Sequence, residues 1–566
     1  MRPFLAWQAS VTAATLNIVS FVERLDRWRR EKPDALAVVD YDIVQSKSQR
    51  SLIRRSAVTT TELWQQVLAL AAALKTRGIG RGDVVSVQLP NWHEFLVAHL
   101  ALYTLGAVTS PVSPIYRKLD LARQIGLSGA KALIVPAQFN NFDYAAMAME
   151  LRAEMASLRD IVIVGSSAPA GACTWAETLA AGSAPALEAE RARLATGADA
   201  LPIKDMILLN FTSGTTGQPK GVMHTTHSLS SCVLPTLDRL QLNADDVVLV
   251  APTLGHGAGF LNGMYVPLHL GATVVYMDAW DARFAAEIIE REGVTYGPVM
   301  PTYLYDLVGH LANSTEKLAT WKTGRVSGGA IPRPLMATLQ ARLPQLRLCP
   351  GWGMSENLYS SCGSPDDPID KRNFTEGNTV GDCVIEIRDA TFTHSLPVGE
   401  VGEIVTRGSS LCIGYYKQEE LTRQSYTTDG WFKTGDLGRL DAEGYLTLVG
   451  RSKDLIIRGG ENVPVVEVEQ LLSEHPDVAE AVVVGIPDAR LSEKVCALLV
   501  MKKGASPLAF NQMSQYLTER RLTRHFIPEY LLIVDSLPRT AIGKIKKQEA
   551  RSQALTRLDT AAKRQH

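Results

Sequence analysis

The sequence has no excess of basic residues and no long apolar run. Lysine and arginine number 58 against 59 aspartate and glutamate residues, whereas nucleic-acid-binding domains are usually basic. No window approaches the roughly 20 apolar residues that a membrane helix needs. The first residues, "MRPFLAWQASVTAATLNIVSF", lack the basic start and continuous apolar core of a signal peptide. These absences argue against a nucleic-acid partner and a transmembrane segment, and they favour a cytoplasmic protein.

The sequence also lacks paired cysteines. Its seven cysteines are dispersed, and no two form a C-x-x-C pair. An odd, scattered set is typical of reduced thiols rather than of a disulfide framework or a zinc site. They are Cys173, Cys232, Cys349, Cys362, Cys383, Cys412 and Cys496.

What the sequence does contain is alternating strand-like and helix-like segments over most of its 566 residues. Such a length exceeds one hydrophobic core, so we expect at least two domains. The alternation predicts βαβ units around mostly parallel sheets. Predicted strands include 83–90, 131–136, 160–165, 206–214, 246–252 and 272–277, and predicted helices include 62–77, 93–107 and 283–293.

The pattern changes after Val380. Short strands separated by Gly and Asp turns predict a small β-rich subdomain, and a compact α+β pattern follows Arg451. We place the domain boundary in "GRSKD", which gives domains 1–450 and 451–566. The segment "FVERLDRWRREKP" predicts an amphipathic helix packed on the large domain. The basic stretch 47–55 is interpreted as a solvated loop rather than a binding patch.

A Gly- and Thr-rich segment, "FTSGTTGQPKG", follows the apolar run "MILLN". It is not a Walker A loop, because Pro219 precedes Lys220 and Gly221 follows it. Its glycines can still turn backbone N–H groups toward an anion, and its hydroxyls and lysine add donors. The alternative is a flexible surface turn. The candidate phosphate-binding residues are Thr212, Ser213, Gly214, Thr215, Thr216, Gly217 and Lys220.

Four further motifs follow in order: "GWGMSEN", "WFKTGDLG", "GRSKDLIIRGGEN" and "PRTAIGKI". With the loop, they resemble the adenylate-forming enzymes, a family of acyl-CoA synthetases, adenylation domains and luciferases. The stretches "HGAGFLNGMYVPLHLGATVV" and "RSKDLIIRGGENVPVVEVE" look closest to cyclohexanecarboxylate and short- or medium-chain fatty acid CoA ligases. The resemblance implies a large N-terminal domain of two doubly wound αβαβα subdomains plus a small β-barrel, and a smaller mobile α+β C-terminal domain.

The resemblance also implies a two-step reaction that uses ATP, Mg²⁺ and coenzyme A. The phosphate loop, with Thr216, would hold the β- and γ-phosphates. Glu356 would bind magnesium, and Lys544 would reach the α-phosphate region. Without the motifs, Glu356 would be an acid at a helix start and Lys544 part of a solvated basic tail. The other implied nucleotide-binding residues are Gly328, Gly329, Ala330, Gly351, Trp352, Gly353, Met354, Ser355, Asp436 and Arg451.

Among these, the ring of Trp352 would stack on adenine and Asp436 would accept both ribose hydroxyls. A core tryptophan and an ordinary turn aspartate are the alternatives. Lys453 would be the hinge between the domains. After rotation, Gly459 and Gly460 would line the pantetheine tunnel.

His256 would lie at the mouth of the acyl pocket, beside the small residues Gly257, Ala258 and Gly259. Phe260, Met264, Met300 and Tyr303 would supply apolar lining, with core packing as the alternative. Gly328 and Gly353 would also border the substrate. The region 252–262 has no Asp to pair with an amine. We therefore expect an apolar carboxylic acid, either alicyclic, aryl or medium-chain.

Three classes of function stay open at this point. The first is a CoA ligase, with a homodimer as a possible assembly. The second is an adenylating enzyme that loads a carrier-protein thiol or oxidises its adenylate. The third is an inactive nucleotide-binding module, against which the intact Lys544, Glu356, Asp436 and Arg451 argue.

Overall fold

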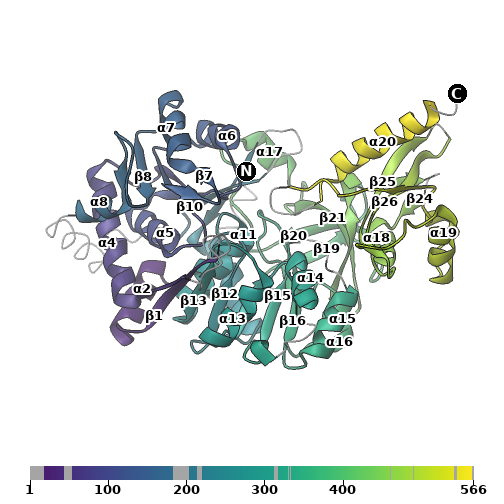
Figure 1. Cartoon of the computed structure of the whole chain (residues 1–566), viewed down its shortest axis with the longest axis horizontal. Helices are drawn as coiled ribbons and strands as arrows, with labels where there is room; N and C mark the ends of the chain where they lie inside the picture. Colours follow the sequence, from purple (N-terminus) through teal and green to yellow (C-terminus); the bar gives the residue numbers. More distant parts are fainter. Residues whose placement is uncertain are drawn as a thin grey trace.

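The structure is a computed structural model. It describes residues 18–43, 54–182, 203–212, 219–310, 316–328, 331, 333–454, 456–458, 461–488, 490–540 and 545–563. A large N-terminal part with two extended sheets lies beside a smaller C-terminal part (Figure 1). Among the described residues, no helix combines the length and apolar character that crossing a bilayer requires.

The first large sheet has nine strands, and its centre is parallel. Its strands read as short apolar runs, as expected where both faces are covered. In spatial order they are β18 (Asn378–Thr379), β17 (Ser361–Cys362), β16 (Arg347–Trp352), β15 (Thr323–Val326), β14 (Tyr296–Val299), β12 (Val247–Val250), β13 (Thr273–Met277), β1 (Leu36–Asp42) and β2 (Arg54–Thr59).

The second large sheet has seven strands. They are parallel except for β11, the edge strand that pairs antiparallel with β10. In spatial order they are β11 (Lys220–Thr225), β10 (Met206–Thr212), β4 (Val108–Pro111), β3 (Val84–Val87), β5 (Ala132–Pro136), β8 (Asp160–Val164) and β9 (Cys173–Thr174).

Helices cover both faces of each sheet, so the layers run αβαβα, as predicted. A shared core lies between the two sheets and contains apolar residues of both. The helices of this middle layer are α2 (Phe21–Glu31), α4 (Thr60–Thr76), α5 (His93–Leu105), α10 (Thr226–Arg239) and α12 (Val266–Leu270). The outer helices are α13 (Ala282–Glu292), α14 (Pro301–His310) and α15 (Arg333–Arg342) on one sheet and α6 (Lys118–Ser128) and α7 (Tyr144–Glu154) on the other (Figure 1).

Local sequence sets several of these boundaries. α4 begins with a capping box, in which Thr59 accepts from the backbone of Glu62 and the Glu62 carboxylate accepts from that of Thr59. α5 ends at Gly106, whose φ of 69° favours glycine. α2 buries Phe21, Leu25 and other apolar residues on the large domain, which confirms the predicted amphipathic helix.

The basic stretch 47–55 is only partly described, and its end is not a solvated loop. Arg54 and Arg55 belong to β2, which pairs with β1. The Arg55 guanidinium donates to the Glu292 carboxylate over 2.8 Å. An arginine that pairs with a partly buried acid on a distant helix is fixed in place, so the interpretation was wrong for Arg55. Residues 47–53 lie outside the described residues.

The β-rich subdomain predicted after Val380 is a four-stranded antiparallel sheet. Its edge strands are not paired with each other, so the small barrel takes the form of an open sheet. The order is β19 (Val384–Arg388), β20 (Gly402–Arg407), β21 (Phe432–Leu440) and β22 (Leu446–Arg451).

The C-terminal part has a five-stranded sheet with helices, as its α+β pattern predicts. In Figure 1, α20 lies along β25 and β26 at the C-terminal end of the chain. Its elements are β23 (Ile456–Arg458), β24 (Glu461–Val463), α18 (Val465–Ser473), β25 (Val478–Asp488), β26 (Ser492–Met501), α19 (Phe510–Glu519), β27 (Tyr530–Ile533) and α20 (Lys547–Lys563).

Two side chains that follow β3, Asn91 and His93, join the two large sheets. The buried Asn91 donates toward backbone carbonyls at the ends of β12 and β13, over 3.0 Å to Met277 and 3.1 Å to Pro252. His93, at the start of α5, bonds through Nδ1 to Asp40 of β1 over 2.6 Å. Asp40, His93 and Glu94 present ligand-type atoms within 4.8 Å of one another. His93 Nδ1 is already paired with the Asp40 carboxylate, so these three side chains are explained as an ion-pair cluster.

We predict that the His93 pair makes stability depend on pH. Burial opposes the imidazolium, but the bond to Asp40 and the nearby charges of Glu94 and Asp40 outweigh it and raise the pKa of His93 to about 9. An unfolded histidine titrates near pH 6.5. The stabilisation is therefore fully present below about pH 6.5 and is lost as the pH rises through about 9.

The measurement is the free energy of unfolding, from denaturant titration, of wild type and His93→Gln from pH 6 to 9.5. We expect the gap between them to shrink as the pH rises, by an amount on the order of 2 kcal/mol. His394→Gln, at a histidine whose side chain is 83% exposed, is the matched control. A gap for His93→Gln that stays constant across this range would contradict the prediction.

Candidate active site

The expected phosphate loop joins two antiparallel strands. β10 ends at Thr212 and β11 begins at Lys220, and these two residues are directly paired. A Walker A loop instead leads from a strand into a helix, so the structure agrees that this is not a Walker A loop. Five of the expected residues, Ser213, Gly214, Thr215, Thr216 and Gly217, lie outside the described residues.

Tyr415 connects Glu356 to this hairpin. The Tyr415 hydroxyl donates to Glu356 Oε1 over 2.8 Å, and Lys220 Nζ lies 5.4 Å from the centre of the Tyr415 ring. Burial raises the pKa of Glu356, while the Tyr415 bond and the charges of Lys220 and Arg451 partly oppose that rise. The structure thus brings a buried carboxylate and two cations of the sequence motifs into one region.

Asp436 forms the second charged contact of the site. Asp436 on β21 pairs in register with Arg451 on β22, and Arg451 Nε lies 3.0 Å from Asp436 Oδ1. The Trp352 indole N–H donates to Asp436 Oδ2 over 2.8 Å. Asp436 is buried, whereas the Arg451 side chain is half exposed. The carboxylate therefore holds an exposed cation in place.

The Trp352 ring itself packs in the core of the four-stranded sheet, beside Ile385 and Ile404. This is the packing that the sequence left open as an alternative. Its stacking on adenine stays a prediction, and its observed contact is the bond to Asp436.

Two glycines of "GWGMSEN" are required by close packing. A Cβ on Gly353 would lie 1.6 Å from the Leu358 carbonyl oxygen, and one on Gly351 would lie 2.5 Å from Arg325 Nη2. Leu358 has a φ of 55°, which is uncommon for a branched side chain. The loop after Met354 therefore makes a tight turn, closed by the Leu358 N–H to the Met354 carbonyl.

Ser355 is fixed by a residue that the motifs did not indicate. Burial lowers the pKa of His224 to about 4, so this imidazole is neutral and its Nε2 pairs with the Ser355 carbonyl over 2.7 Å. Tyr415 was also missed. No spacing in the sequence connects either residue to its partner, because the partners lie far along the chain.

The expected acyl segment has small residues toward open space and large ones in the core. His256 caps α11 (Gly257–Phe260), which continues into a π-helical turn, η1 (Leu261–Tyr265). A Cβ on Gly257 would meet nothing within 4 Å, whereas one on Gly259 would lie 2.1 Å from the Thr253 carbonyl oxygen. Only the first of these glycines leaves room beside it.

Phe260 packs in the core, which is the alternative that the sequence left open, and its place in the substrate site stays a prediction. It is 1% exposed and packs against His99 and Tyr265, with ring centres 4.9 and 5.3 Å apart. Met264 is likewise buried in the core. An apolar side chain on this segment turns toward α5, because the core between the sheets lies on that side.

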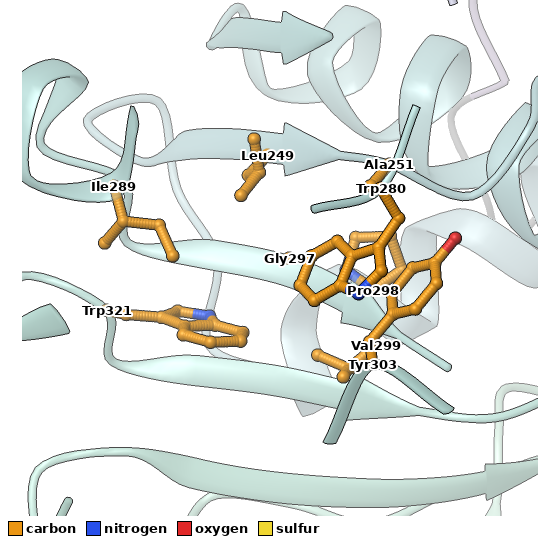
Figure 2. A pocket seen from close by; sticks show the side chains of 9 residues that line it. All are labelled: Leu249, Ala251, Trp280, Ile289, Gly297, Pro298, Val299, Tyr303 and Trp321. Atoms are coloured by element: carbon orange, nitrogen blue, oxygen red, sulfur yellow. The ribbon is translucent and has the colours of Figure 1, made fainter. Parts of the chain in front are cut away.

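Met300 lies against the loop of Gly328, where a Cβ would come within 2.5 Å of the Met300 methyl group. Tyr303 faces a separate small cavity. It stacks on Trp280 at 4.1 Å and lines a small cavity with Val299 and Trp321 (Figure 2). That cavity, of about 10 Å³, has room for about one water molecule, so it does not hold an acyl group.

The expected hinge follows β22 directly. Lys453 belongs to a short 3₁₀ turn, Ser452–Asp454, and the Ser452 hydroxyl donates to Glu403 over 2.7 Å. Gly329, Ala330, Gly459, Gly460 and Lys544 lie outside the described residues. Of the described residues around Lys544, Arg539 and Ile545 form an isolated antiparallel bridge.

Comparisons with known proteins agree with this arrangement. Residues 25–416 match the family model of AMP-binding enzymes, and residues 467–544 match that of the AMP-binding enzyme C-terminal domain. The chain is 30% identical to the medium-chain fatty-acid–CoA ligase of Escherichia coli, over 94% of this chain and 90% of that protein.

It is 32% identical to a 3-[(3aS,4S,7aS)-7a-methyl-1,5-dioxo-octahydro-1H-inden-4-yl]propanoyl:CoA ligase of Mycobacterium tuberculosis, over 93% and 97% of the two chains. The crystal structure of the anthranilate CoA ligase AuaEII with anthranoyl-AMP shares the fold, with a TM-score of 0.83 at 23% identity, over 97% of this chain and all of that one. The chain therefore belongs to the AMP-binding, adenylate-forming enzymes and is an AMP-forming ligase of the acyl-CoA synthetase type.

Proposed function

We propose that this enzyme activates an apolar carboxylic acid as an acyl-adenylate, releases pyrophosphate, and then transfers the acyl group to coenzyme A with release of AMP. The first step brings a carboxylate against the α-phosphate of ATP, so it needs positive charge and oriented donors. The observation that carries the proposal is the convergence of Lys220, Glu356 and Arg451 around Tyr415 and Asp436.

In this proposal the loop from Thr212 to Lys220 holds the β- and γ-phosphates, and Asp436 with Arg451 binds the ribose. Glu356 fits magnesium, because Tyr415 occupies only one of its carboxylate oxygens. Mg²⁺ prefers one or two carboxylates together with phosphate oxygens. When bound, it would neutralise phosphate charge. The glycine loop at Gly328, Gly329 and Ala330 passes between adenine and the acyl group.

The second half of the reaction is assigned to the smaller domain. We propose that Lys544 reaches the α-phosphate during adenylation and is withdrawn when the domain rotates about Lys453. Gly459 and Gly460 then line the path of the CoA pantetheine. Such a closure around ligand is a hinge motion of a common kind.

We assign the acyl group to the open space beside Gly257. His256, Ala258, Met300 and Gly328 are its expected borders. Alicyclic, aryl and medium-chain acids suit its small, uncharged residues. The named relatives act on a medium-chain fatty acid and on a bicyclic propanoate. We place the enzyme in the cytoplasm, where ATP and CoA are available.

The acceptor has one alternative, which a relative supports. A salicyl-AMP ligase / salicyl-S-ArCP synthetase of Mycobacterium tuberculosis is 32% identical over 92% of this chain. An acyl-adenylate that forms but does not react with CoA would indicate a carrier-protein thiol instead.

The test is mass spectrometry of enzyme, ATP, Mg²⁺ and a panel of acids, with and without CoA. The panel contains benzoate, cyclohexanecarboxylate, cinnamate, graded fatty acids and a steroid side-chain acid. We expect acyl-AMP without CoA and acyl-CoA with it, for one class of acid. The absence of pyrophosphate release with every acid would overturn the proposal.

Lys544→Ala should separate the two half-reactions. We expect adenylation to fall at least ~100-fold, because the transition state loses a stabilising charge. Thioester formation from supplied acyl-adenylate should suffer much less. Lys546→Ala, which removes only a surface pair with Glu549, is the matched control. Equal losses in both half-reactions would show that the assigned role is wrong.

Asp436→Asn should weaken ATP binding. An amide offers one acceptor oxygen where the carboxylate offers two, and its NH₂ group would face either the Trp352 or the Arg451 donor. We expect the KM for ATP to rise at least about tenfold, with a smaller change in the KM for the acid. The measurement is initial-rate pyrophosphate release.

The control for this variant is Asp441→Asn, which removes an ion pair with Lys371 just beyond the end of β21. Its KM for ATP should stay at the wild-type value. If the two variants changed this constant equally, Asp436 would have no specific part in ATP binding.

A further inference from the structure

A cluster of four buried polar side chains lies behind the proposed acyl segment. Arg325 and Tyr296 come from neighbouring strands, β15 and β14, Asn262 comes from η1, and Tyr359 follows the "GWGMSEN" motif. Arg325, Tyr296 and Asn262 are fully buried, and Tyr359 is 6% exposed. We call these four residues the buried polar cluster.

Arg325 brings a positive charge without an acidic partner. No ion pair among the residues that the structure describes includes it, and its contacts are neutral. They are the Ser361 carbonyl at 3.3 Å, the Ser327 hydroxyl at 3.5 Å, the Cys362 thiol and the face of the Tyr359 ring at 3.2 Å. A buried cation without a counter-charge is costly. A cation above a phenol ring makes its O–H a stronger hydrogen-bond donor.

The hydrogen bonds of the cluster form a chain of donors that leads from Tyr296 through Asn262 to Tyr359. The Tyr296 hydroxyl donates to Asn262 Oδ1 over 2.5 Å. The Asn262 amide nitrogen donates to the Ala258 carbonyl over 2.8 Å and to Tyr359 Oη over 2.5 Å. Both amide protons are therefore used, and Tyr359 Oη is an acceptor. The remaining phenolic proton has no acceptor among the residues that the structure describes.

A chain of hydrogen bonds links Tyr359 to the segment assigned to the acyl group. Asn262 bonds at once to Tyr359 and to Ala258, and Ala258 is next to Gly257, whose side faces open space. In the sequence, Tyr359 lies three residues after Glu356. Asn262 thus connects the Tyr359 hydroxyl to the segment that would receive the acyl chain.

We propose that Tyr359 donates a hydrogen bond to a neutral oxygen on the acyl group, so that the preferred substrate is an apolar acid with a keto, hydroxyl or ether oxygen distant from its carboxylate. A second carboxylate is disfavoured, because the positive charge of Arg325 is fully buried and the Tyr359 hydroxyl is neutral. This inference rests on the proposed function and narrows its substrate class.

The first test uses wild-type enzyme and matched acids. Cyclohexanecarboxylate is compared with its 3-oxo and 4-oxo derivatives, and octanoate with its 5-, 6- and 7-oxo derivatives, by kcat/KM for pyrophosphate release. We expect at least one oxo position to raise kcat/KM about tenfold or more over the parent acid. If no oxo acid exceeds its parent, the inference is overturned while the proposed function stands.

The second test is Tyr359→Phe, which keeps the ring under Arg325 and removes only the hydroxyl. We expect the ratio of kcat/KM between the best oxo acid and its parent to fall to about 1. Tyr265→Phe is the matched control. It removes another buried hydroxyl, which pairs with His99 over 2.7 Å, and should keep the wild-type ratio.

A Tyr359→Phe ratio equal to that of wild type would overturn the inference, because the preference would then come from another group. If Tyr359→Phe does not fold, the wild-type ratios alone still decide. Failure of every acid to give acyl-AMP would overturn the proposed function, and the inference with it.

Discussion

The position of the site depends on one buried amide. Asn91 leaves the carboxyl end of β3 in one sheet and reaches the carbonyls at the ends of β12 and β13 in the other, while its own oxygen accepts the Leu254 N–H over 2.9 Å. These groups are buried, and unpaired backbone carbonyls there would be costly. Asn91 therefore fixes the turn 252–256 relative to both sheets. His256 and the open side of Gly257 follow from that placement.

Much of this architecture could be predicted from sequence because buried parallel strands are short apolar runs. The runs predicted at 131–136 and 160–165 are β5 and β8, and the capping box and glycine stops set the helix ends. The motifs also placed Glu356, Asp436 and Arg451 in one site, and the structure brings their charges together.

The contacts that hold those residues could not be predicted. Tyr415 is 59 positions from Glu356, and His224 is 131 positions from Ser355. Only the three-dimensional fold brings them together. Phe260 shows another limit. A π-helical turn follows it directly, and such a turn changes which residues share a face. Periodicity alone could not tell lining from core at this position.

The two acids of the site have the same kind of surroundings. Glu356 and Asp436 are each buried, each accepts a bond from an aromatic donor, and each lies near a cation that the sequence motifs indicated. Fixed donors and charges of this kind need no rearrangement when a polyanion binds. Arg451 is the last residue of β22 and is held by Asp436. A rotation that began at Lys453 would leave both this cation and the Ser452–Glu403 bond in place. The arrangement of Glu356, Asp436 and Arg451 would then persist while the smaller domain turned a different face toward it.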